Sequence, residues 1–117
     1  MLPIVEIGEA ELAACVAPIR AAFAAAAVRL GLSAESCPSH PAYLTIERLL
    51  RARARGSRMF AARAAGEVVG CCELAPGEGG FRLERLAVAP GFRGLGLGGA
   101  LLEHAGAAAA AAGGRTL

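Results

Sequence analysis

The stretch that decides the fold reads PGFRGLGLGGALL and spans residues 90–102. It is rich in glycine up to Gly99, and residues 100–112 are then dominated by alanine, the best helix former. This pattern predicts a turn that opens a helix over residues 100–112. A turn of this kind places unpaired backbone amides at the positive end of a helix dipole, where phosphate oxygens are held best. The stretch therefore predicts a phosphate-binding turn.

Two other glycine motifs compete with this interpretation. Gly94, Gly96 and Gly99 satisfy the dinucleotide pattern GxGxxG, but that motif requires a βαβ unit and an acidic residue about 20 positions further on. The elements predicted upstream do not alternate in this way. A nucleotide-triphosphate loop needs Lys and then Ser or Thr, where this chain has Leu97 and Gly98. A helix entry that merely packs closely remains the plain alternative.

The chain upstream of this turn is predicted to form a succession of short helices and strands. Apolar spacing and turn residues predict, in order, a strand at 2–7, a helix at 9–30, a loop at 32–43, a helix at 46–55 capped by Thr45, strands at 59–64 and 67–74, a glycine-rich turn at 75–80 and a strand at 81–88. Ala65 and Gly66 predict a tight hairpin. Pro18 predicts a kink or a division of the first helix into two pieces.

Composition narrows the classes of function. The length of 117 residues suits one domain, and the formal charge of +2 comes from arginines spread along the chain, so neither nucleic-acid nor membrane binding is indicated. No basic segment precedes an apolar one at the N-terminus, which predicts a cytoplasmic protein. Lys, Asp, Asn and Gln are absent, a bias typical of a GC-rich bacterial genome. The four cysteines lack CxxC spacing, so no metal site is predicted.

The residues around the turn resemble a known family. Arg93, Gly96 and Gly98 match the signature (Arg or Gln)-x-x-Gly-x-(Gly or Ala), preceded by LERLAVAP at 83–90 and followed by ALLEHA at 100–105. In these features the chain resembles the GNAT superfamily of N-acetyltransferases. The resemblance implies an α/β (α+β) fold in which helices flank a mixed, mostly antiparallel sheet. It also implies that 1–117 is a single domain lacking the family's final strand, helix and strand.

The resemblance also implies a binding site for acetyl coenzyme A. Backbone groups on the last strand would pair with the pantetheine arm, and amides of the turn would hold the pyrophosphate, with Arg93 adding a charged contact. The implied cofactor-binding residues are Leu86, Ala87, Val88, Arg93, Gly94, Leu95, Gly96, Leu97 and Gly98. A backbone amide of this strand, near residues 86–88, would polarise the thioester carbonyl.

Transfer to an amine requires a general base, and two carboxylates on predicted strands are candidates. Glu84 is favoured over Glu73 because it lies on the strand that would carry the thioester. The competing interpretation is a surface ion pair between Glu84 and Arg82 or Arg85. His40, in the loop between the first two helices, is a candidate acceptor contact or a structural residue. Arg48, Arg51 and Arg55 are expected to form a solvated helix face.

One departure from the family concerns the general acid of the reaction. The tyrosine that usually protonates the leaving thiolate lies beyond the fifth strand of the family's fold, and Tyr43 is not at that position. The chain is therefore expected to be a fragment or to be completed by another chain. An unpaired strand edge would favour a homo-oligomer.

The predicted function is direct transfer of an acetyl group from acetyl-CoA to a primary amine of a small molecule or a protein. The alternative is an acyl-CoA-binding module without turnover, completed by a partner chain.

Overall fold

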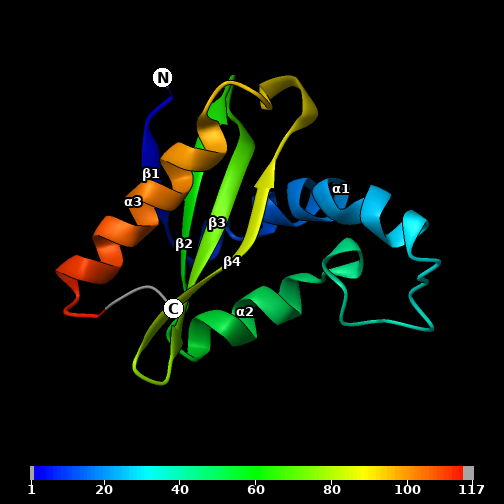
Figure 1. The fold of residues 1–117 in the computed structure, drawn as a ribbon, viewed down its shortest axis with the longest axis horizontal. Coiled ribbons are helices and arrows are strands. Elements are labelled where there is room, and N and C mark those ends of the chain that lie inside the picture. Colours follow the sequence, from blue (N-terminus) through cyan, green and yellow to red (C-terminus); the bar gives the residue numbers. More distant parts are fainter. Residues whose placement is uncertain (1, 115–117) are drawn as a thin grey trace.

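The computed structural model describes residues 2–114, which form a four-stranded antiparallel sheet with helices on both faces (Figure 1). The expected α/β class is thereby confirmed. The elements are β1 (Ile4–Ile7), α1 (Ala13–Arg29), α2 (Ile46–Ala54), β2 (Arg58–Ala64), β3 (Glu67–Gly77), β4 (Gly80–Val88) and α3 (Leu97–Ala111), with short 3-10 turns at Glu9–Glu11, Pro41–Tyr43 and Pro90–Phe92.

The strands follow one another in the sheet in chain order, β1-β2-β3-β4. The predicted hairpin between β2 and β3 is confirmed: Ala65 and Gly66 have φ of 52° and 81°, as the tightest hairpin turn requires. The predicted turn at 75–80 is present but is confined to Glu78 and Gly79, because β3 continues to Gly77 and pairs Ala75 with Arg82. Pro76 is tolerated there because β2 begins only at Arg58, opposite Leu74, so no strand lies beside Pro76 on that side of β3 to accept a backbone hydrogen bond.

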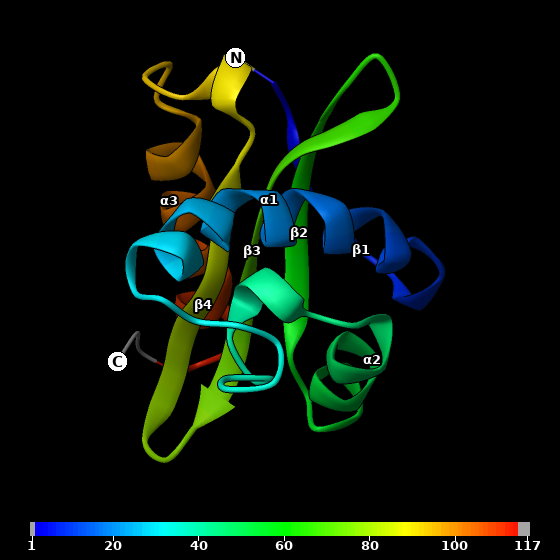
Figure 2. The same cartoon turned by 90° about the vertical axis from the view of Figure 1, so that its right-hand side faces the viewer.

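The two faces of the sheet are covered by different helices, α1 and α2 on one and α3 on the other (Figure 2). Successive side chains of a strand point to opposite faces, so β2 sends Met59 and Ala61 toward α1 while Phe60 and Ala62 pack beneath α3. Each face has its own hydrophobic core. The central strands are therefore apolar on both sides.

The helices differ from expectation at three points. First, α1 runs through Pro18 as one helix; the carbonyl that loses its donor belongs to Ala14, an exposed residue that water can reach. Second, Thr45 stands at the start of α2, but its side chain makes no capping hydrogen bond. Third, α3 begins at Leu97 rather than at residue 100, because the first helical turn needs no internal donors and so accepts glycine.

The position of α3 depends on Gly70 in the middle of β3. A Cβ at this residue would lie 2.9 Å from Cδ2 of Leu97 and 3.1 Å from Cδ1 of Leu101. Both leucines are buried, and they lie on one face of α3 because they are four residues apart. Gly70 thus brings the start of α3 against the sheet and fixes where the preceding turn stands.

Candidate active site

The site is built on β4, which has a sheet neighbour only on its β3 side among residues 2–114. The backbone N–H of Ala89 donates to the carbonyl of Val69 at 2.8 Å, so Ala89 faces β3. Antiparallel strands alternate in the direction of their backbone groups, and the polar groups of Val88 therefore face the open edge. The last part of β4 offers a ligand the same contacts that a further strand would use.

The predicted turn follows directly, with the 3-10 turn Pro90–Phe92 leading to two left-handed glycines. Gly94 and Gly96 have φ of 77° and 82°, a conformation that side-chain-bearing residues rarely adopt. The first backbone N–H of α3 to find an acceptor is that of Ala100, which donates to Gly96 at 3.0 Å. Within the described part of the chain, the six amides of residues 94–99 donate to no acceptor.

Arg93 connects the turn to the strand. Its Nε donates to the carbonyl of Val88 at 3.1 Å, and the side chain is otherwise exposed. This contact uses a group on the open edge of β4, and it leaves the two terminal nitrogens of the guanidinium without a partner in the described residues. The signature arginine therefore holds the turn against β4 while keeping donors available beside the amides of residues 94–99.

A bulge interrupts the other half of β4. Glu84 pairs with Glu73 in the register and Ala87 pairs with Cys71, so β4 has one residue more than β3 between these pairs. Arg85, at the bulge, has φ of 50°. The extra residue bends the strand and changes which side chains share a face. No feature of the sequence indicated this bulge, because its backbone conformation is adopted by an arginine rather than a glycine.

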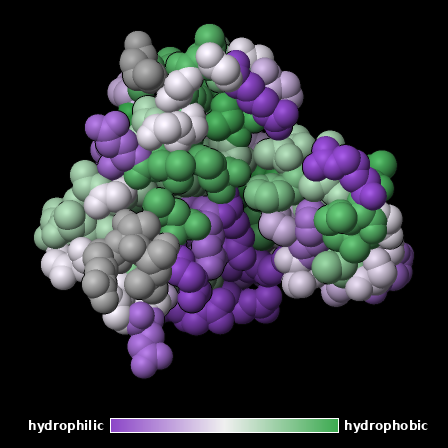
Figure 3. Space-filling view, in the orientation of Figure 1, coloured by the Kyte–Doolittle hydropathy of each residue, from purple (hydrophilic) through white to green (hydrophobic). Residues whose placement is uncertain are grey.

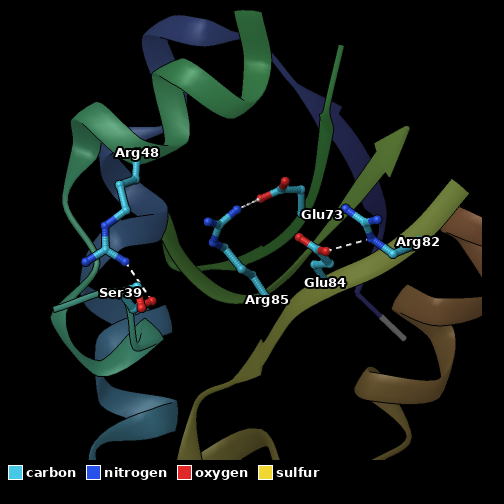
Figure 4. Close-up of polar contacts among 6 residues, drawn as sticks. All are labelled: Ser39, Arg48, Glu73, Arg82, Glu84 and Arg85. Atoms are coloured by element: carbon cyan, nitrogen blue, oxygen red, sulfur yellow. Dashed lines mark hydrogen bonds and ion pairs between the residues drawn. The ribbon is translucent and has the colours of Figure 1, made fainter. Parts of the chain in front are cut away.

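The two candidate carboxylates face each other across β3 and β4, and each is paired with an arginine (Figure 4). Glu73 is 2% exposed and its Oε1 accepts from Nη1 of Arg85. Glu84 is the more accessible carboxylate: its side chain is 37% exposed and its Oε1 accepts from Nε of Arg82 at 3.0 Å. The expected surface pairing of Glu84 with Arg82 is thus present, and the buried pairing of Glu73 was not foreseen.

Both carboxylates line a polar cavity of about 370 Å³ between the end of α2 and the strands β3 and β4. Figure 3 shows strongly hydrophilic residues gathered in the hollow below the apolar upper part of this face. The lining residues are Ala52, Arg55, Ser57, Glu73, Ala75, Pro76, Arg82, Glu84 and Arg85. The bulge therefore separates a side-chain-lined cavity from the backbone-lined edge that leads to the turn.

A family model describes the part of the chain that carries this geometry. Residues 55–117 match the acetyltransferase (GNAT) domain. The chain belongs to the GNAT acetyltransferase family. Its activity is therefore the one common to that family, transfer of an acetyl group from acetyl-CoA, and the family alone does not specify the acceptor.

Solved structures of acetyltransferases share this fold. The PaiA N-acetyltransferase of Thermoplasma acidophilum, solved with coenzyme A, superposes with a TM-score of 0.77 at 21% identity over 97% of this chain and 74% of that one. A GCN5-related N-acetyltransferase from Ralstonia eutropha JMP134 superposes with a TM-score of 0.72 at 20% identity, over 100% of this chain and 82% of that one. A GNAT acetyltransferase from Staphylococcus aureus Mu50 superposes with a TM-score of 0.70 at 15% identity, over 97% of this chain and 69% of that one. The comparison with curated proteins found no match.

The loop before α2 is held by its own side chains. Nδ1 of His40 accepts from the N–H of Ala42 at 3.1 Å, and the ring packs edge-on against Phe23, so His40 is occupied as a structural cap. Arg48 donates to the carbonyls of Pro38, Ser39 and Tyr43. The predicted solvated face is confirmed for Arg51 and Arg55, which are exposed, but it is wrong for Arg48, which is half-buried and binds loop carbonyls that helical spacing cannot reveal.

Three of the four cysteines of this acetyltransferase lie in the core. Cys15, Cys71 and Cys72 are fully buried, and all four cysteines are free. Burial raises the pKa of the Cys72 thiol to about 11, and a hydrogen bond with Cys15, reinforced by burial, raises that of Cys71. Such thiols stay protonated and are poor nucleophiles.

Metal binding and membrane insertion are two further possibilities for residues 2–114. No group of three or more His, Cys or Glu side chains there is placed to hold a metal ion. No helix in the same part of the chain combines the length and the apolar character that crossing a membrane requires.

Proposed function

We propose that the amides of residues 94–99 hold the pyrophosphate of acetyl-CoA and that Leu86, Ala87 and Val88 receive its pantetheine arm along the open edge of β4. The observation that carries this proposal is the run of six amides at residues 94–99, leading into the start of α3, that donate to no acceptor among residues 2–114. These donors stand at the positive end of a 15-residue helix, beside the free nitrogens of Arg93. Acetyl-CoA supplies the activated thioester.

The glycines of the turn support the same assignment. A Cβ built at Gly91, Gly94 or Gly99 would meet no atom within 4 Å, so open space lies above the backbone at these positions. At Gly98 the nearest atom is a methyl group of Val88 at 3.8 Å. A large anion can therefore approach the amides directly, which a plain packing role for the glycines does not require.

We propose Glu84 as the general base that takes a proton from the acceptor amine. The partner of Glu84, Arg82, is exposed, and an exposed ion pair of this kind contributes less than about 1 kcal/mol to stability. The ammonium group of an incoming acceptor can therefore take the place of Arg82 beside Glu84. Glu73 is the alternative base, but it is buried and already bonded to Arg85. Glu84 also adjoins the bulge, beyond which the edge of β4 becomes available to the thioester.

Carbonyl polarisation is assigned to the backbone. The N–H of Val88 faces the open edge of β4 and is the candidate donor to the thioester oxygen, in the manner of a one-donor oxyanion site. The buried thiols described above support direct transfer rather than an acyl-cysteine, since Cys71 and Cys72 are inaccessible. The acceptor is proposed to be a primary amine of a small molecule or of a protein.

The wider setting follows from composition and from the free cysteines. Unpaired cysteines support a reducing compartment, so we place the protein in the bacterial cytoplasm, acting without a metal or nucleic acid. Residues 1–117 are proposed to act as one domain. The open edge of β4 supports self-association, and it equally supports completion of the cleft by another chain.

The decisive experiment is a titration of the protein with acetyl-CoA, followed by thermal shift and by release of thiol in the presence of primary amines. We expect a concentration-dependent rise in Tm and amine-dependent release of coenzyme A. Binding without release from any amine would favour the acyl-CoA-binding module instead. Absence of binding would remove the assignment of the turn.

A further inference from the structure

The polar cavity at the end of α2 carries information about the acceptor that the family does not provide. Its volume of about 370 Å³ lies within the range of small-molecule sites. Glu84 lines the cavity, and Leu86, where the coenzyme segment of β4 begins, is two residues further along the strand. An amine held in the cavity would therefore lie next to the proposed base and close to the proposed position of the thioester.

Among the described residues, the cavity contains one arginine that forms no ion pair with an acidic side chain. Its lining includes three arginines and two glutamates, and each glutamate is paired with its own arginine, Glu73 with Arg85 and Glu84 with Arg82. Arg55, at the C-terminal end of α2, makes no ion pair or hydrogen bond with any side chain of residues 2–114. The hydroxyl of Ser57 adds a neutral donor to the same wall.

We propose that this cavity selects a small amine that also carries a carboxylate, with Arg55 as the residue that binds the carboxylate. The proposal rests on the function proposed above, in which Glu84 receives the amine. A guanidinium presents a planar pair of donors that matches a carboxylate. The acceptor is thus held at two ends, its ammonium group by Glu84 and its carboxylate by Arg55.

The unpaired donors of the lining favour a carboxylate. Arg82 and Arg85 are already paired with Glu84 and Glu73, so Arg55 is the guanidinium of the lining left to bind an anionic group of the acceptor. One guanidinium matches the planar pair of oxygens and the single charge of a carboxylate, whereas a phosphate monoester carries close to two negative charges at pH 7, more than Arg55 alone neutralises. A protein amine is disfavoured as well, because the cavity offers volume for a small molecule.

The test compares matched pairs of acceptors with the full chain and acetyl-CoA. 4-Aminobutyrate is compared with pentylamine and β-alanine with butylamine, while 3-aminopropyl phosphate is the phosphate arm. We expect kcat/KM for each carboxylated amine to exceed that of its partner by about tenfold or more, which is the usual effect of a hydrogen bond to a charged group. The difference should arise from KM rather than from kcat. Equal values within each pair, or a preference for the phosphate, would overturn the proposal.

Arg55→Gln identifies the residue responsible. It should raise KM for 4-aminobutyrate about tenfold and leave pentylamine unchanged. Arg51→Gln is the matched control, because Arg51 is an exposed arginine of the same helix that does not line the cavity. A similar change for both amines in Arg55→Gln, or for both variants, would contradict the assignment.

A binding measurement separates this inference from the proposed function. Calorimetric titration of 4-aminobutyrate and pentylamine into protein loaded with coenzyme A does not depend on turnover. Preferential binding of 4-aminobutyrate that Arg55→Gln abolishes supports the inference even if no amine releases thiol, in which case only the catalytic proposal fails. Turnover of alkylamines and carboxylated amines at equal rates would contradict this inference and would still support the proposed acetyltransferase function.

Discussion

The two ends of β4 differ in how they are built. Beyond Val88, the proposed coenzyme site consists of backbone amides positioned by glycines, with Arg93 as its one charged side chain. Before the bulge, the cavity is lined by side chains from the end of α2, from β3 and from β4. One of its two ion pairs, Arg85 with Glu73, joins neighbouring strands. The first end is local in sequence and the second is assembled by the fold.

This difference assigns different tasks to the two ends. In the proposed coenzyme site, backbone donors would bind groups common to every coenzyme A thioester, and their position is set by φ angles and by the packing of α3 on Gly70. Side chains in the cavity can change without disturbing the turn, so that end can determine which acceptor reacts. Variants at the cavity should therefore alter turnover or acceptor affinity, and variants at the turn should alter coenzyme affinity.

The largest expected effect is that of Glu84→Gln on turnover. Loss of a general base typically lowers kcat by about 10²–10⁴-fold, because the amine must then lose its proton to water. Coenzyme affinity should be unchanged, because Glu84 lies on the far side of the bulge from the turn. Thiol release at saturating acceptor and a separate coenzyme titration measure the two quantities. Full turnover in this variant would assign the base elsewhere, with Glu73 the next residue to test.

Glu73→Gln should act on stability. Removing one partner of a buried pair leaves the other charge uncompensated, and Arg85 is 21% exposed, so we expect a loss of about 2–3 kcal/mol in the free energy of unfolding. The control is Glu6→Gln, which breaks the exposed pair of Glu6 with Arg58 and should cost less than about 1 kcal/mol. Urea unfolding measures both. Equal losses would show that the pair at the bulge has no special structural role.

Gly94→Ala tests the backbone-built end. A side chain at φ of 77° costs about 1 kcal/mol or more, and Gly31→Ala, at φ of 68° with equally open space around its Cβ, imposes the same strain far from the turn. Both variants should lose similar stability, but only Gly94→Ala should lose coenzyme affinity, by about tenfold. Calorimetric titration with coenzyme A decides. Equal affinities in the two variants would leave the glycine with a purely conformational role.

The smallest expected effect is that of Gly99→Ala. Gly99 and Gly106 both lie in α3 with no atom within 4 Å of a built Cβ, so alanine at either position should raise stability by about 0.5–1 kcal/mol. Only Gly99→Ala places a methyl group over the free amides, and it should weaken coenzyme binding a few-fold. A Gly99→Ala variant that is more stable and binds as tightly as Gly106→Ala would place the coenzyme away from the first turn of α3.

Prediction from the sequence succeeded where neighbouring residues determine the structure. The hairpin at Ala65 and Gly66 and the left-handed turn at Gly94 and Gly96 are local, and their residue types report the backbone angles directly. The prediction failed where contacts between segments distant in the sequence determine the structure. The continuation of β3 to Gly77 depends on its pairing with β4, and the role of Arg48 depends on loop carbonyls that helical periodicity does not encode.

By itself, the sequence determined the family and the α/β class and led to the proposal that residues 90–102 bind phosphate, because all three depend on glycine positions and apolar spacing along the chain. Only the tertiary structure decided which carboxylate is buried, that the bulge at Arg85 lies between the cavity and the turn, and that Arg55 lines the cavity with Glu84 without an ion pair among residues 2–114. The physical reason is that the energy of a charged side chain depends on its partners and its solvent access, and both are set by residues far away in the sequence.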